Sequence, residues 1–183
     1  RGWPGMPGSL DFMHWTWNTC PAGWKVQYKC HCNNPTIILE AVAMKDLWTW
    51  HSFFGLHGSH NDLNVLLRSP LFFRLIIGDA PACNYSLNRH DYSVGYYLAD
   101  GIYPPWATLV KTISRPKGNK NIHFAQCQEA ARKDVERAFI VLQKHFALVR
   151  GPAEYWSSKV LWRIMTCCII LHKMIIEDKK GYA

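Results

Sequence analysis

The sequence predicts a single α/β domain, and two patterns support that prediction. Stretches rich in β-branched and aromatic residues occur early in the chain, and the alternating LDFMHWTW at residues 10–17 is the first of them. A late segment instead repeats apolar residues at helical spacing, with Val135, Phe139, Leu142 and Phe146 in one stripe. A chain of 183 residues is long enough to bury one sizeable core.

Two more strands and a helix are predicted after this first strand. Residues 36–43 are an apolar, largely β-branched run and residues 47–56 are rich in aromatics, and both patterns are typical of strands. A short turn at Lys45 and Asp46 joins them. Asp62 is predicted to lie in the loop that opens the following helix.

Two short strands are predicted before the late helix. The apolar run at residues 94–99 ends at Asp100. Residues 108–113 are a further strand, and the Pro, Gly and Lys residues of 115–120 indicate a loop. On the late helix, Glu136 lies one position from the apolar stripe, so its carboxylate can face the sheet.

The last apolar run, residues 167–176, predicts a buried helix. It is shorter than a membrane span and contains His172 and Lys173. His172 is expected to be a hydrogen-bonded histidine on that helix. No stretch resembles a signal peptide, so we expect a soluble intracellular protein.

The seven cysteines form no recognisable metal or disulfide pattern. Cys30, His31 and Cys32, with Cys20 nearby, do not match the spacing of common zinc sites. Without a secretory signal, we expect these cysteines to be reduced thiols in a loop.

The net charge of +8 lies entirely in the last part of the chain. Residues 1–110 hold seven basic and seven acidic side chains, whereas residues 111–183 hold fourteen basic and six acidic ones. Clustered Lys and Arg favour contact with a phosphate backbone, although basic surface also serves solubility alone. DNA is therefore a candidate partner. The candidate contacts are Lys111, Arg132, Lys133 and Arg137.

Four acidic residues stand in well-formed motifs, although the chain has only thirteen such residues. They are Asp11 in GSLDFMHW, Asp62 in HGSHNDLNV, Asp100 in YYLADGIYP and Glu136 in RKDVERAF. Mg²⁺ prefers carboxylate and phosphate oxygens, and a pair of ions can clamp the attacking and leaving oxygens of a phosphoryl transfer. Scattered carboxylates are more often solvated surface. Arg132, four residues before Glu136, also allows an ordinary i,i+4 ion pair.

Seven stretches that cover nearly the whole chain carry a family resemblance. They are PGSLDFMHWTW, PTIILEAVA, LWTWHSFFG, GSHNDLNVLLRSPLF, YYLADGIYPPWATLVKTI, FAQCQEAARKDVERAFIVLQKHFALVRGPA and CIILHKMIIED. Together they closely resemble the plant branch of the PIF/Harbinger transposases. The resemblance implies a DDE-type nuclease and transposase catalytic domain over residues 1–183, with an RNase H-like fold in which helices flank a mixed sheet.

The resemblance also implies roles for individual residues. Asp11, Asp100 and Glu136 are expected to be catalytic and to hold a divalent metal, Mg²⁺ or Mn²⁺, with Asp62 as an additional ligand. The implied reaction cuts and joins DNA phosphodiesters by a two-metal mechanism. A nuclear location is a further expectation, and a Myb-like accessory protein and a homo-oligomer are open as partners.

Departures from related sequences favour an alternative. Ile140 stands where Gly is typical, Lys173 where Asn is typical, and Phe12 replaces a smaller residue. Ile140 risks overpacking a contact between helix and sheet. Because the chain begins almost at the first acidic motif, we expect it to lack upstream DNA-binding helices. The alternative is a domesticated or decayed derivative that no longer cuts DNA and serves as a nuclear DNA- or protein-binding module.

Overall fold

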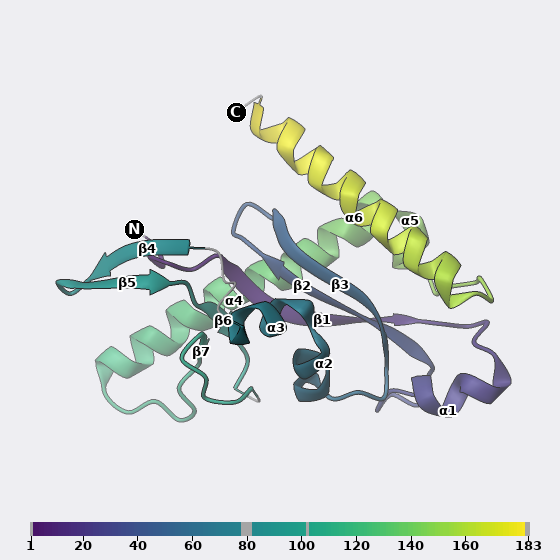
Figure 1. The fold of residues 1–183 in the computed structure, drawn as a ribbon, viewed down its shortest axis with the longest axis horizontal. Coiled ribbons are helices and arrows are strands. Elements are labelled where there is room, and N and C mark those ends of the chain that lie inside the picture. The colour runs from purple at the N-terminus through teal and green to yellow at the C-terminus, as the bar shows by residue number, and fades with distance from the viewer. Residues whose placement is uncertain (1, 78–81, 102, 182–183) are drawn as a thin grey trace.

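A computed structural model describes residues 2–77, 82–101 and 103–181. Its centre is a five-stranded mixed sheet in the order β3-β2-β1-β6-β7 (Figure 1). The strands are β1 (Gly8–Thr16), β2 (Thr36–Ala43), β3 (Thr49–His57), β6 (Tyr97–Ala99) and β7 (Leu109–Lys111). β2 is antiparallel to β1 and β3, whereas β1, β6 and β7 are parallel. The expected α/β class and mixed sheet are confirmed.

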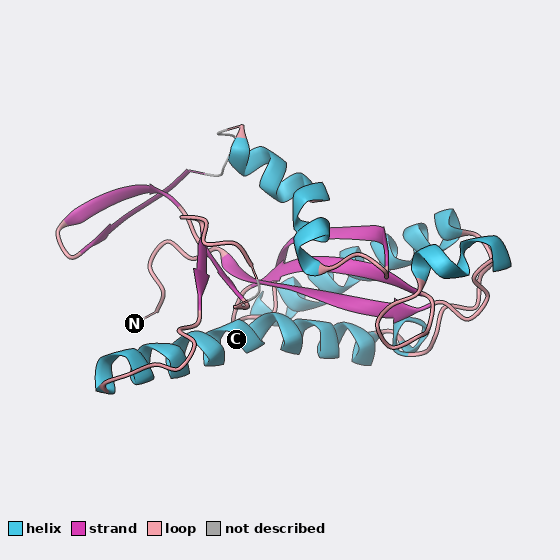
Figure 2. Ribbon diagram, turned by 90° about the horizontal axis from the view of Figure 1, so that it is seen from below, coloured by secondary structure: helices cyan, strands magenta, loops and turns pink. Residues whose placement is uncertain are grey.

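Helices cover both faces of the sheet (Figure 2). The long helices α4 (Asn119–His145) and α6 (Ser158–Gly181) pack on one face, α4 against β1 and α6 against β3. The shorter α2 (Asp62–Arg68) and α3 (Pro70–Ile76) cover the other face. The remaining short turns are η1 (Ala22–Trp24), α1 (Lys25–Tyr28) and α5 (Ala147–Arg150). Within the described ranges, no helix is both long and apolar enough to cross a membrane.

The alternation of the strands divides the core in two. Leu39 and Ala41 of β2 face α4 and α6, whereas Val42 packs with Leu66 and Phe72 of α2 and α3. Every residue of β2 is buried, since helices cover both of its faces. This explains why residues 36–43 read as a continuous apolar run rather than an alternating one.

The two long helices are amphipathic. Val135, Phe139 and Leu142 of α4 are buried, as the spacing predicted. Ile140 is 50% exposed, so the expected overpacking at this position is wrong, because residue 140 lies outside the buried stripe. The expectation of a buried terminal helix holds for one face only, since Met174 of α6 is 59% exposed.

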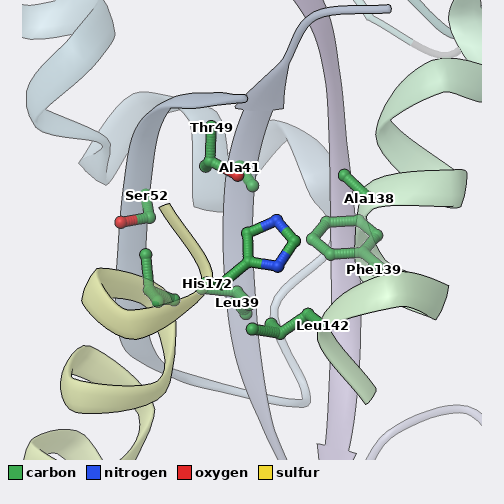
Figure 3. A pocket seen from close by; sticks show the side chains of 9 residues that line it. Leu39, Ala41, Thr49, Ser52, Ala138, Phe139, Leu142 and His172 are labelled. Carbon is green, nitrogen blue, oxygen red and sulfur yellow. The ribbon is translucent and has the colours of Figure 1, made fainter. Parts of the chain in front are cut away.

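His172 is the core histidine expected from the sequence. It is 1% exposed, and Figure 3 shows its ring between β2 and α4. Its Nε2 lies 3.3 Å from the carbonyl oxygen of Leu47, and its Nδ1 lies 3.2 Å from Nδ1 of His145. Because a carbonyl only accepts, Nε2 carries the proton and Nδ1 accepts from His145. The cavity here is about 10 Å³, which holds no more than a water molecule.

Two other parts of the chain differ from the prediction. Cys30 and Cys32 form a disulfide, so the expectation of reduced thiols is wrong for this pair. The turn at His31 brings their Cα atoms to 5.3 Å, a separation that a disulfide can span. The hairpin of β4 (Ala82–Leu87) and β5 (His90–Val94) was not predicted, and it projects from the end of the sheet (Figure 1).

Candidate active site

The candidate site lies where β1 and β6 run side by side. Ser9 of β1 pairs in parallel with Leu98 of β6. Two further residues along each strand bring Asp100 level with Asp11. The strand that leads to Asp100 therefore adjoins the strand that carries Asp11, as the prediction required.

The pleat directs both aspartates to the same face of the sheet. Leu10 and Ala99 belong to the core beneath α2 and α3. Successive side chains of a strand point to opposite faces, so the next residues, Asp11 and Asp100, are directed to the α4 face.

Each aspartate is held by a backbone amide of its own segment. Oδ1 of Asp11 accepts from the amide of Phe12 at 2.8 Å, and Oδ1 of Asp100 accepts from the amide of Gly101 at 2.5 Å. These bonds restrict the rotation of both carboxylates. β1 and the residue that follows β6 thus present two oriented oxygen donors.

Helix α4 adds a third carboxylate and a cation. Nη1 of Arg132 lies 3.1 Å from Oε1 of Glu136 and 3.6 Å from Oδ2 of Asp11. The side chain of Arg132 is 20% exposed, and that of Glu136 is 42% exposed. The i,i+4 pair that we considered as the ordinary alternative is present, but the same guanidinium also joins α4 to β1. Arg132 thereby offsets the repulsion between two carboxylates.

Two residues that the sequence did not single out fix α4 over this site. Nε2 of the fully buried Gln128 donates to the carbonyl oxygens of Ala99 and Val110, both at 3.1 Å. Oγ of Ser9 donates to the carbonyl oxygen of Ala131 at 2.8 Å. Helical spacing could have indicated Gln128, because it lies one turn before Arg132 and therefore on the same side of the helix.

Comparison with models of known families identifies the family of this chain. A family model described as plant transposon protein matches residues 1–183. The chain belongs to the plant transposon protein family. Membership supports a transposase-related origin, and the match includes all four acidic motifs. Searches of curated proteins and of solved structures found no match.

The fourth acidic residue of this plant transposon protein, Asp62, lies on α2, which covers the face of the sheet opposite to α4. Asp62 is the first residue of α2, as expected, and Asn61 caps the helix by accepting from the amide of Asn64 at 2.9 Å. The side chain of Asp62 lies outside the described part of the chain. Its role as an additional ligand stays a prediction.

The four predicted DNA contacts differ in their surroundings. Lys111 and Arg137 each have a structural partner: Nζ of Lys111 donates to the carbonyl oxygen of Tyr103 at 2.7 Å, and Arg137 pairs with Asp134 at 2.9 Å. Arg132 lies between the acids, as described above. Lys133 is exposed on α4 beside the site. Lys133 is therefore the side chain among the four that is best placed to meet a phosphate.

The described part of the chain holds no preformed metal cluster. Over residues 2–77, 82–101 and 103–181, no three His, Cys, Asp or Glu side chains lie close enough to hold a metal ion. In this structure the positive charge that Asp11 and Glu136 share is the guanidinium of Arg132.

Proposed function

We propose that this plant transposon protein is a catalytic domain of the DDE type, which cuts and joins DNA with a divalent metal and is related to the PIF/Harbinger transposases. One observation carries the proposal. Adjacent parallel strands bring Asp11 and Asp100 to one level and one face, and α4 brings Glu136 to the cation that Asp11 contacts. Paired strands and a long helix suit a reaction in which a displacement of about 1 Å can cost roughly a hundredfold in rate.

The topology supports an RNase H-like interpretation of the fold. The resemblance implied a mixed sheet with acids on the first strand, near a fourth strand and on a late helix. The chain has Asp11 on β1, Asp100 after the neighbouring β6, and Glu136 on α4.

The donor set fits Mg²⁺ or Mn²⁺. Asp11, Asp100 and Glu136 offer carboxylate oxygens, which these hard cations prefer. Arg132 supplies positive charge where a metal would supply it, because its guanidinium lies within 4 Å of both Asp11 and Glu136. A bound metal would polarise the scissile phosphodiester and lower the pKa of an attacking water.

The residues of the chain have complementary tasks in this proposal. The three carboxylates hold the cation, and without it they repel a DNA phosphate. Arg132 keeps Asp11 and Glu136 together when no DNA is bound. The exposed Lys133 meets the phosphate backbone next to the acids.

Plasmid nicking in Mg²⁺ or Mn²⁺ tests the proposal. We expect the wild-type chain to nick supercoiled DNA, Asp100→Asn to abolish nicking, and Asp62→Asn to weaken it by less. Asp178→Asn is the matched control, since Asp178 is exposed on α6 away from β1 and β6. Equal nicking by wild type, Asp100→Asn and Asp178→Asn would contradict the assignment.

A second candidate function rests on Arg132. A guanidinium that already satisfies Asp11 and Glu136 stabilises the fold without metal, as expected of a domesticated derivative that binds DNA or protein but does not cut. Calorimetric titration with Mn²⁺ separates the candidates. DNA binding without metal uptake or nicking, in both wild type and Arg132→Met, would favour the non-cutting derivative. A nuclear location and a Myb-like partner accompany either candidate as predictions.

A further inference from the structure

The β4–β5 hairpin and the first turns of α4 border a hollow lined by aromatic rings. We name it the aromatic hollow, and its rings are Trp3, Tyr85, Tyr92, Tyr96 and Phe124. Its volume is about 460 Å³, within the range of small-molecule sites. Figures 1 and 2 both place the hairpin, the N-terminus and the start of α4 at the same end of the molecule.

Four of the five rings form two packed pairs, and the fifth, Tyr96, meets Tyr85 edge to face at 6.1 Å. Tyr85 and Tyr92 stack with centroids 5.1 Å apart and planes 13° apart. Trp3 and Phe124 meet edge to face at 5.7 Å. Tyr92 nevertheless remains 44% exposed, so aromatic surface of the hairpin stays accessible to a ligand. Gly5, at φ +76°, permits this packing, because a Cβ there would collide with the ring of Tyr85.

The chain segment that connects two lining residues of the aromatic hollow is rich in basic side chains. Val110 and Phe124 both line it, and the segment that joins them is residues 111–123. That segment holds four basic side chains and no acidic one. They are Lys111, Arg115, Lys117 and Lys120. A ligand with both a planar ring and negative charge complements such a surface.

Two elements connect the aromatic hollow with the acidic site. On α4, Phe124 lies eight residues before Arg132, which is about 12 Å along the helix on the same ridge. In the sheet, Tyr96 precedes β6 and Asp100 follows it, a span of about 13 Å. One DNA strand advances roughly 3.4 Å per nucleotide in a duplex, so either path covers about four nucleotides.

From these observations we infer that the aromatic hollow binds an unpaired base of the DNA strand that the acidic site holds. The base stacks on Tyr92, and the neighbouring phosphates of the DNA strand lie along the basic segment 111–123. Because the lining is mainly apolar, recognition depends on stacking and tolerates any base. A paired base would first have to leave the duplex, at a cost of a few kcal/mol. The inference rests on the proposed function, because it presumes a DNA substrate.

Binding of two DNA probes tests the inference. One probe is a blunt duplex, and the other is the same duplex with a short single-stranded extension that contains 2-aminopurine. Fluorescence anisotropy is measured in EDTA, so that no strand is cut. We expect tighter binding of the extended probe, with protection of 2-aminopurine from acrylamide quenching. Tyr92→Ala should lose about 5- to 150-fold of affinity for the extended probe and little for the blunt one.

Matched variants separate stacking from general damage. Tyr92→Phe keeps the ring and should keep the preference, whereas Tyr92→Leu keeps apolar bulk and should lose it. Tyr155→Ala removes a tyrosine of similar exposure, 48%, outside the aromatic hollow and should change nothing. Equal wild-type affinity for both probes, or equal losses in Tyr92→Ala and Tyr155→Ala, would overturn this inference and leave the proposed function standing. Failure to bind either probe in EDTA would overturn this inference, and the proposed function would still be decided by plasmid nicking in Mg²⁺ or Mn²⁺.

Discussion

Replacing Gln128 should uncouple α4 from the strand that leads to Asp100. The amide of Gln128 donates two hydrogen bonds from a fully buried position, one to Ala99 and one to Val110. A hydrogen bond contributes a net of about 0.5–1.5 kcal/mol, so Gln128→Ala should lower the free energy of unfolding by about 1–3 kcal/mol. For a domain of this size, each kcal/mol corresponds to a fall of roughly 2–4 °C in the melting temperature.

Urea unfolding followed by circular dichroism measures this loss. Gln126→Ala is the control, since Gln126 is an exposed residue of the same helix and of the same chemistry. We also expect Gln128→Ala to reduce nicking in conditions where the variant is still folded, because Ala99 directly precedes Asp100. If Gln128→Ala and Gln126→Ala unfold at the same urea concentration, the two hydrogen bonds do not anchor α4 as argued.

Three further predictions concern metal, pH and salt. Millimolar Mg²⁺ or Mn²⁺ should raise the melting temperature by binding the folded state, and Asp11→Ala should abolish that shift; an unchanged wild-type curve would count against the metal site. Burial lowers the pKa of His172 and of His145 below 6.5, so the unfolded chain binds protons more readily. Stability should therefore be full above pH 6.5 and fall as the pH drops below it, and a flat urea midpoint across that range would refute this. Lys133→Ala should reduce the slope of log affinity for DNA against log salt concentration by about one unit per lost phosphate contact. Arg137→Ala should change that slope less, because Arg137 already pairs with Asp134. Equal slopes in wild type and Lys133→Ala would exclude the contact.

Most of the sheet and the late helix could be predicted from local pattern. The strand at residues 36–43 begins and ends where the apolar run does. Asp62 opens α2, and the stripe of Val135, Phe139 and Leu142 is buried. The β4–β5 hairpin escaped prediction although β4 alternates, with Cys83, Tyr85 and Leu87 separated by Asn84 and Ser86. Every residue of β5 is exposed, so the hairpin adds little to the core. Its turn, with Asn88 and Arg89 at positive φ, lacks the Gly that usually marks such a turn.

The sequence by itself determined the strands of the central sheet, the late helices with their amphipathic faces, and the family, because alternation, helical spacing and motif order depend on near neighbours along the chain. Only the tertiary structure decided that Arg132 forms ion pairs with both Asp11 and Glu136, and that Gln128 joins α4 to β6 and β7 by hydrogen bonds. The contact of Ser9 with Ala131 shows the reason, since 122 positions separate two residues that packing of α4 on β1 brings into hydrogen-bond distance. Such pairs are set by how elements stack, and no local pattern encodes that choice.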